Sequence, residues 1–236
     1  MKHKQGEIAN VNLVGYQSLM IRTKLDHLLI GTPKIFGNNG EMSAIAKDPV
    51  DRSLMLGLEG LEGNQVGDPL HHGGRDKAVH LYPIEHYDFW REKYPDVFAL
   101  NEPGAFGENF SCAGLTEDQL CLGDIFRVGS ALIECSHARQ PCWKLNHRFG
   151  KGDVLKTVVK TGKSGSYFRV LEEGRVQAGD DFVQQARPYP DWPLDRLFGM
   201  IIGGGHKGQA AELAALSKNR TLAESWRVRA RQLAAG

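Results

Sequence analysis

The sequence predicts a mainly β protein of the α+β class, with a strand-rich body followed by a small helical domain. Short apolar runs with imperfect alternation recur through the first 187 residues, and a period of two is typical of strands. Turns must be frequent, because the chain of 236 residues has 28 glycines against 10 prolines. After residues 188–190 the apolar spacing becomes helical. We therefore expect two domains, residues 1–187 and 191–236.

The N-terminal half is expected to consist of strands and turns. Strands are predicted at 7–22, 26–36, 43–47 and 77–82, with Pro49 closing the third of them. Residues 37–40 form a turn, and the glycines of 57–64 predict an irregular loop. In the fourth strand Ala78, His80 and Tyr82 share one face. An amphipathic helix over 83–94 follows, with Pro83 at its start.

The C-terminal half alternates in the same way before it becomes helical. Strands are predicted at 123–129, 131–135, 165–171 and 175–183, and helices at 143–149 and 153–160. The last three helices are expected to begin at Pro193, to span 208–216, and to follow a capping box at Thr221–Glu224.

Composition excludes several classes of partner. A net charge of +1, with 24% charged residues, gives no general attraction to nucleic acid or to an anionic membrane. No apolar run approaches membrane-spanning length, and the N-terminus shows no signal-peptide core. The four cysteines (Cys112, Cys121, Cys135, Cys142) show no paired framework, which favours a cytoplasmic location.

The candidate reactive group is Cys142. Pro141 suits the first position of a helix, so Cys142 would fall in the first turn, where the helix dipole favours thiolate over thiol. Positive charge is added nearby by Arg139, Lys144 and Arg148. Such a cysteine can hold a soft metal or attack an electrophile. A buried, inert cysteine at an element boundary remains an alternative of about even weight.

Two other loops carry polar groups. Gly73 and Gly74 lie among His72, Arg75 and Lys77, a composition that suits an anion such as phosphate, although a charged turn is the commoner explanation. The three histidines of this region (His71, His72, His80) have no known zinc spacing. Further along, Glu108 can act as an acid or a base and Asn109 can donate and accept hydrogen bonds, but both are also ordinary loop residues.

Four motifs in order resemble those of MOSC domains, the molybdenum-cofactor sulfurase C-terminal type. They are His71–Ala78, Gly107–Asn109, Gly123–Arg127 and Arg139–Leu145. The resemblance is closest to the YiiM-like branch, whose short C-terminal three-helix domain resembles residues 191–234. It covers nearly the whole chain, and only the segment from about 15 to 33 departs from the expected start.

The resemblance implies a MOSC-type β-barrel body with a few peripheral helices and a basic cleft that binds the molybdenum cofactor, a molybdopterin. Cys142 matches the metal-ligating cysteine and would be catalytic, with Glu108 as a second catalytic candidate. Ser136, Arg139 and Lys144 would hold the pterin phosphate or orient ligands. The remaining cofactor-binding candidates are His72, Gly73, Arg75, Lys77 and Asn109.

The function that the resemblance implies is the reduction of N-hydroxylated compounds to amines, as in detoxification of 6-N-hydroxylaminopurine. No flavin or nicotinamide motif is visible, so a separate electron-donating reductase is expected as partner, with the protein a monomer or homodimer. Pyridoxal phosphate binding is only a family-level association.

Three alternatives stay open at the level of sequence. Cys142 could carry a persulfide in a sulfur carrier or transferase, and the protein could bind the cofactor without being an enzyme. A zinc module could use Cys135, His137, Cys142 and His147, although their spacing is unusual.

Overall fold

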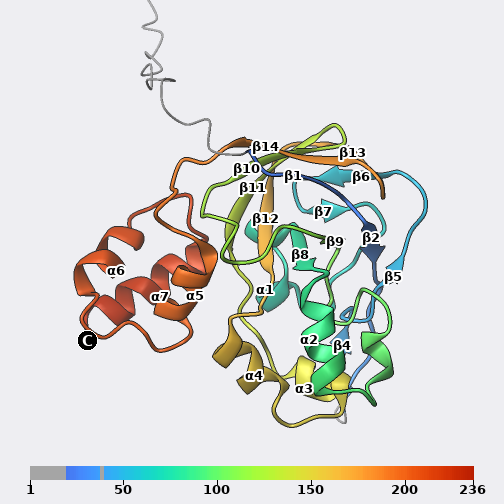
Figure 1. The fold of residues 1–236 in the computed structure, drawn as a ribbon, viewed down its shortest axis with the longest axis horizontal. Coiled ribbons are helices and arrows are strands. Elements are labelled where there is room, and N and C mark those ends of the chain that lie inside the picture. Colours follow the sequence, from blue (N-terminus) through green and yellow to red (C-terminus); the bar gives the residue numbers. More distant parts are fainter. Residues whose placement is uncertain (1–19, 38–39) are drawn as a thin grey trace, which may run out of the picture.

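The computed structural model describes residues 20–37 and 40–236. A nine-stranded sheet forms the body, in the order β1-β14-β10-β11-β12-β8-β9-β2-β5 (Figure 1). Neighbouring strands are antiparallel, apart from the parallel pair β8 and β9. The strands are β1 (Arg22–Lys24), β2 (His27–Ile30), β5 (Asp48–Pro49), β8 (Val79–Pro83), β9 (Phe110–Cys112), β10 (Ile125–Val128), β11 (Ala131–Ala138), β12 (Ser166–Glu172) and β14 (Asp181–Ala186).

The α+β class is confirmed, but the sheet is not closed into a barrel. Among the described strands, β1 and β5 are the two edges, and no ladder joins them. Most of the strand predicted at 7–22 lies outside the described residues; only β1 overlaps its end.

Two smaller sheets complete the strand content. One has the order β13-β6-β7, from β13 (Gly174–Val176), β6 (Leu54–Gly57) and β7 (Gly60–Leu61). The predicted irregular loop over 57–64 is therefore wrong in part, because β6 and β7 pair as a tight hairpin. The other sheet pairs β3 (Lys34–Ile35) with β4 (Met42–Ser43), so the predicted strand at 43–47 ends almost where it begins, and Pro49 belongs to β5.

Helices lie around the sheet, and the last three follow its strand β14 in the chain. They are α1 (Pro69–His72), α2 (His86–Lys93), α3 (Lys144–Phe149), α4 (Val154–Thr161), α5 (Leu194–Ile201), α6 (Ala210–Leu216) and α7 (Glu224–Ala234), with 3-10 turns η1 (Arg75–Lys77) and η2 (Phe98–Leu100). The helix predicted at 83–94 starts later, because Pro83 completes β8. None of the described helices is long and apolar enough to cross a membrane.

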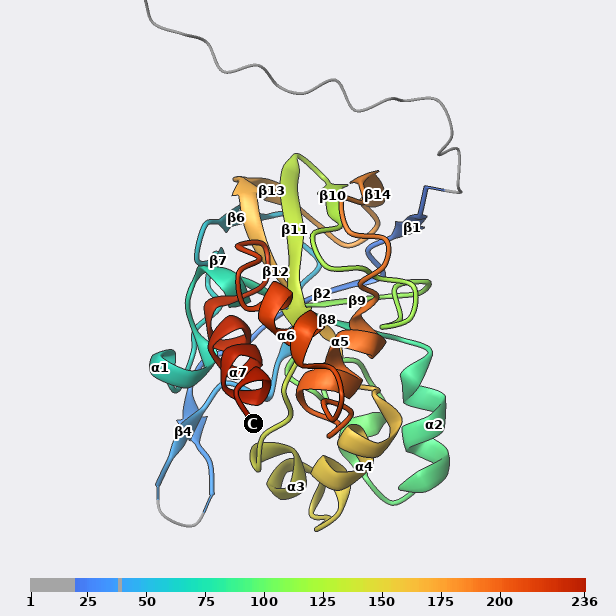
Figure 2. The same ribbon diagram turned by 90° about the vertical axis from the view of Figure 1, so that its left-hand side faces the viewer.

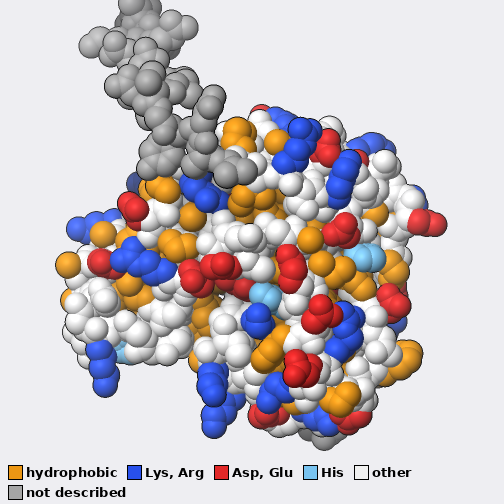
Figure 3. All heavy atoms as spheres, in the orientation of Figure 1, with side chains coloured by type: hydrophobic (Ala, Val, Ile, Leu, Met, Phe, Trp, Pro, Cys, Tyr) orange, Lys and Arg blue, Asp and Glu red, His pale blue; other side chains and the backbone are white. Residues whose placement is uncertain are grey.

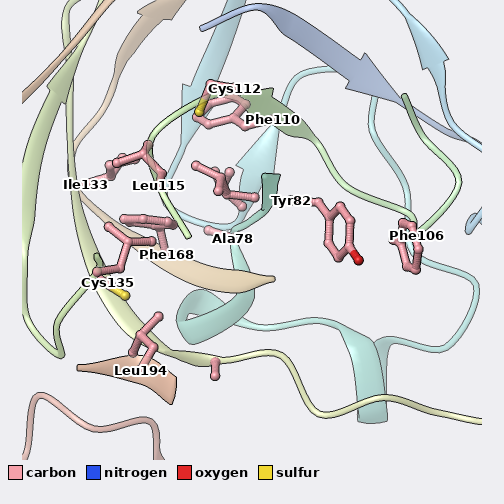
Figure 4. Close-up of a cluster of buried hydrophobic side chains, with 14 of the residues drawn as sticks. Ala78, Tyr82, Phe106, Phe110, Cys112, Leu115, Ile133, Cys135, Phe168 and Leu194 are labelled. Carbon is pink, nitrogen blue, oxygen red and sulfur yellow. The ribbon is translucent and has the colours of Figure 1, made fainter. Parts of the chain in front are cut away.

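One apolar core joins the sheet to the helices. Figure 4 shows Phe110, Ile133 and Phe168 within it, together with the sulfur atoms of Cys112 and Cys135. At one side Tyr82 stacks on Phe106 with ring centroids 3.9 Å apart. Every residue of β8 is buried, so the alternation predicted for Ala78, His80 and Tyr82 does not separate an inner face from an outer face.

The three predicted C-terminal helices are present (Figure 2). Of these, α5 packs against β11, and α7 packs against both α5 and α6. The predicted capping box is wrong, since the residue before α7 is Ala223, which has no side chain that can accept a hydrogen bond. The body supplies the cap instead, because Glu224 N–H donates to Asp76 Oδ2 (3.2 Å). Ala223 N–H also donates to the carbonyl of Ser136 (3.3 Å). The division into two domains stays a prediction.

We expect Asp76→Ala to loosen this docking. The variant removes the cap of α7 and one of the two carboxylates that bind Arg169. The other carboxylate, that of Glu134, stays 2.6 Å from Nη1 of Arg169. The cost should be about 1–2 kcal/mol, since both groups are partly exposed. Hydrogen exchange should rise over 224–234, and Asp88→Ala, which breaks only a surface pair with Arg91, is the matched control. Unchanged exchange in α7 would contradict the assignment.

Candidate functional site

The segment that follows β11 places three of the predicted site residues. Arg139 N–H donates to the carbonyl of Gly165 (2.8 Å), which continues the pairing with β12 beyond the end of the strand. The predicted helix exists but begins at Lys144, with Trp143 as its N-cap. Pro141 is therefore not its first residue, and Cys142 lies before the helix. The carbonyl of Cys142 accepts the N–H of Leu145 (3.1 Å). The predicted placement of Cys142 inside the first helical turn is therefore wrong.

A second wall comes from α1 and η1. Gly73 N–H closes α1 by donating to the carbonyl of Pro69, and Gly74 begins η1 with a φ of +95°, which only glycine adopts easily. This turn places His72 and Lys77 beside the segment that carries Cys142, and Lys77 Nζ donates to the carbonyl of His71 (2.6 Å).

These walls enclose an inner cavity of about 90 Å³. Four of its lining residues are cations: Lys47, Lys77, Arg139 and Lys144. Among the described residues neither Asp nor Glu lines it, so the cavity concentrates positive charge. The other lining residues include His72, His80, Gly107, Asn109, Cys142 and Tyr167. An anionic ligand is the natural complement of this arrangement.

An outer groove of about 560 Å³ adjoins the cavity. Its aromatic lining residues are His71, His72, His137, Trp143, Tyr167 and Trp226, so the C-terminal helices supply part of the wall. The two spaces share five lining residues: His72, Lys77, Cys142, Lys144 and Tyr167. Cys142 therefore lies where the cationic cavity meets the aromatic groove.

The charges of the cavity act on its titratable groups. Burial lowers the pKa of Lys47 to about 7, although Glu108 opposes this, and its Nζ donates to Asn64 Oδ1 (2.7 Å). The pKa of His72 falls to about 4 through burial and through the nearby charges of Lys144 and Arg139. Burial, with Arg139, also holds the pKa of His80 well below its ordinary value. Both histidines are thus neutral near pH 7.

Two buried groups in the cavity lack partners. Arg139 is 5% exposed, and its Nη1 has no hydrogen-bond partner. Nε2 of the buried His80 also has no hydrogen-bond partner. A buried guanidinium that is not fully paired is costly, so a ligand that accepts hydrogen bonds and carries negative charge would relieve it. The residues present therefore fit the phosphate of a pterin cofactor.

The four cysteines differ sharply in access. Cys112, Cys121 and Cys135 are buried, and burial raises the pKa of each thiol, to about 11 for Cys121. Cys142 is half-buried at the edge of the groove. Within residues 20–37 and 40–236, no three His, Cys, Asp or Glu side chains gather as a metal site, so the zinc module lacks a ligand set. One thiolate suits a metal that arrives with its other ligands already in place.

Several predicted site residues do not line the cavity. Glu108 is fully buried and accepts hydrogen bonds from the hydroxyl of Tyr87 and from the N–H groups of Gly104 (2.7 Å) and Phe106 (3.1 Å). The structure gives it the task of holding the 104–107 loop, and its predicted catalytic role is not supported. Gly73 and Arg75 are also absent from the lining, and Arg75 is exposed.

Ser136 and Asn109 support the site through the backbone. The Ser136 hydroxyl lies 2.6 Å from the carbonyl of Asp76, next to Lys77, and is fully buried. Asn109 does line the cavity, but its carboxamide accepts the N–H of His80 (3.3 Å) and donates to the carbonyl of Leu29 (3.2 Å). The prediction that it faces the cleft agrees with this position.

Sequence reasoning missed Lys47 and Tyr167. Lys47 looked like one more residue of a strand, and Tyr167 like a strand aromatic. Burial raises the pKa of Tyr167, whereas the charge of Arg139 opposes the rise, which places the phenol beside the guanidinium. Neither residue belongs to a local motif, so only the folded chain reveals them.

Comparison with known proteins agrees with this geometry. Residues 68–183 match the family model of the MOSC domain, which is associated with molybdenum-cofactor binding. The uncharacterized protein YflK of Bacillus subtilis is 38% identical over 205 residues, which cover 85% of this chain and 89% of that protein. A protein named reductase from Gibberella moniliformis is 38% identical over 153 residues, which are 64% of this chain and 27% of that protein.

A solved structure extends the similarity beyond the matched segment. The crystal structure of YiiM from Geobacillus stearothermophilus has a TM-score of 0.75 and 33% identity, and the match covers 90% of this chain and 99% of that one. The similarity thus includes the C-terminal helices as well as the sheet. The chain belongs to the MOSC domain family, as a YiiM-like member.

Proposed function

We propose that this protein is a molybdenum-cofactor-dependent reductase that converts N-hydroxylated compounds, such as 6-N-hydroxylaminopurine, to amines. The observation that carries the proposal is the position of Cys142, the one cysteine of four that is not buried, between a cavity suited to an anion and an aromatic groove. The MOSC family and the relative named reductase support the same class of chemistry.

The chain would hold the cofactor through its own cations. Arg139, Lys144, Lys77 and Lys47 would bind the pterin phosphate, and the Cys142 thiolate would ligate the metal. When bound, the cofactor supplies a metal that exchanges two electrons and accepts oxygen. The neutral His72 and His80 add no charge and can accept or donate a hydrogen bond.

The stoichiometry of the overall reaction shows that the protein needs a source of electrons and protons. R–NHOH with two electrons and two protons gives R–NH2 and water. The chain shows no flavin or nicotinamide motif, so the proposal includes a separate electron-donating reductase. Sulfur transfer through a Cys142 persulfide is a weaker alternative, because it gives no role to the Arg139 guanidinium, whose buried Nη1 lacks a partner.

We expect Cys142→Ser to abolish reduction of 6-N-hydroxylaminopurine and to lower bound molybdenum, because a serine hydroxyl is a poor soft-metal ligand. Bound pterin should fall less, since the cationic contacts remain. Cys112→Ser, Cys121→Ser and Cys135→Ser are the matched controls, and those that fold should stay active, because these thiols are buried. Elemental analysis and turnover give the readouts. A Cys142→Ser protein with wild-type turnover would refute the proposal.

Arg139 and Arg75 form a second matched pair, since both were predicted to bind the cofactor but only Arg139 lines the cavity. Arg139→Ala should weaken pterin binding about tenfold, the loss of one charge-assisted contact, and so lower the pterin recovered per protein. Arg139→Lys keeps the charge without the two-pronged geometry and should recover part of the binding. Arg75→Ala should bind pterin normally. Equal losses in both alanine variants would point to a general charge effect.

Binding of the anion should weaken as pH rises. Lys47, with a pKa of about 7, is charged below that pH and neutral above it, so the affinity for a phosphorylated pterin should fall as pH rises from 6 to 9. The bound anion itself raises the pKa of Lys47, so the midpoint should lie at or above 7. Lys47→Arg keeps its charge and should flatten this profile, whereas Lys156→Met, on the exposed surface, should not change it. Calorimetry on cofactor-free protein measures the affinity. A wild-type profile in Lys47→Arg would exclude Lys47 as the titrating group.

A further inference from the structure

We propose that Trp143 is the stacking residue of the outer groove and selects planar aromatic substrates. This inference rests on the proposed function and names the substrate class of the same site. Trp143 directly follows Cys142 and lines the groove, so a ring placed against it would hold its substituents near the thiolate.

Trp143 is unusual among the tryptophans of this chain. Trp90 and Trp226 are 0% and 2% exposed, and Trp192 is half-buried under Arg196, whereas Trp143 is 46% exposed. An exposed indole beside a reactive group offers a planar apolar face on which an aromatic ligand can stack. Its position matters more than its exposure, because Phe98 is 86% exposed and lines neither space.

The indole is braced by its neighbours. Its ring centroid lies 6.1 Å from that of Phe36 and 6.2 Å from that of His147, and Phe36 packs edge-on against His147 at 4.6 Å. At Gly37, whose φ is +85°, a Cβ would lie 3.3 Å from Cη2 of Trp143, so the backbone after β3 passes close to the ring edge. A rotamer held in this way loses little entropy when a ligand stacks on it.

Three other aromatic residues of the groove, His137, Tyr167 and Trp226, are held more tightly. His137 stacks on Tyr167 at 5.1 Å and contacts Trp226 at 5.5 Å, and His137 and Trp226 are almost fully buried. Burial lowers the pKa of His137 to about 3, so this wall adds no charge near pH 7. The groove therefore combines a neutral aromatic wall with one exposed indole, a combination that suits a flat, uncharged base.

The chemistry separates this ligand from the cofactor. The cations gather in the inner cavity, and of them only Lys77 and Lys144 also reach the groove, where Asp68 adds a carboxylate. The cationic cavity is the better binding site for an anionic pterin, and the indole is the better contact for a neutral planar substrate.

The test compares two N-hydroxylated substrates in the holo-protein. Trp143→Ala should raise KM for 6-N-hydroxylaminopurine about tenfold, the usual loss for one stacked base, and leave KM for an aliphatic N-hydroxylamine unchanged. Trp143→Phe should restore most of the affinity, whereas Trp143→Leu, which keeps bulk without a π face, should not. Phe98→Ala is the control for removal of an exposed aromatic side chain.

A binding measurement keeps the test independent of turnover. Adenine, the flat product of the purine reaction, should quench tryptophan fluorescence in wild type and in Trp192→Phe, and lose this quenching in Trp143→Phe. If KM for both substrates and the quenching are unaffected in Trp143→Ala, the inference is overturned while the reductase proposal stands. A rise in KM for the electron donor alone, or lost pterin content, would overturn it in favour of a partner or cofactor contact. If wild type reduces neither substrate, the proposed function fails, and quenching still decides whether Trp143 stacks a base.

Discussion

The irregularity in β11 at Ser136 is the constraint on which the arrangement of the site depends. The register with β12 shifts between Cys135 and His137, so Cys135 points into the core while His137 reaches the groove. The Ser136 hydroxyl contacts the carbonyl of Asp76, and its own carbonyl accepts the N–H of Ala223. One buried residue thus ties β11 to the turn that carries Lys77 and to the start of α7. A regular strand would leave these three pieces without a common anchor.

A second constraint is the positive charge that the fold leaves without carboxylates in the inner cavity. Elsewhere the surface mixes both signs, as the face in Figure 3 shows. Arg187, which is partly buried, binds the fully buried Asp124 with 2.7 Å between its Nη2 and Oδ2. Arg139 is different, because its Nη1 has no partner. A buried guanidinium nitrogen without a partner costs stability, and local costs of this kind are typical of binding sites.

The sequence predicted most strands and the last helices, because these follow from local patterns; the role of Cys142 stays a prediction. Errors arose where tertiary contacts override those patterns. Thr221 seemed a good helix cap, but Asp76, distant in sequence, caps α7 instead. The catalytic role of Glu108 stays a prediction, and in the fold its carboxylate holds a loop. Lys47 could not be found from sequence, since its importance comes from burial beside residues far along the chain.

If the proposed function holds, the division between cavity and groove would explain why one cysteine is enough to ligate the metal. A metal bound by protein side chains alone needs several converging ligands, and the described part of the chain offers no such cluster. A metal delivered by an organic cofactor needs only an anchor for that cofactor and one further ligand. The cationic cavity can serve as the anchor and Cys142 as the ligand, while the aromatic groove lies on the open side of the thiol. The C-terminal helices reach this groove through Ser225 and Trp226, so they form part of the space in which a substrate would lie.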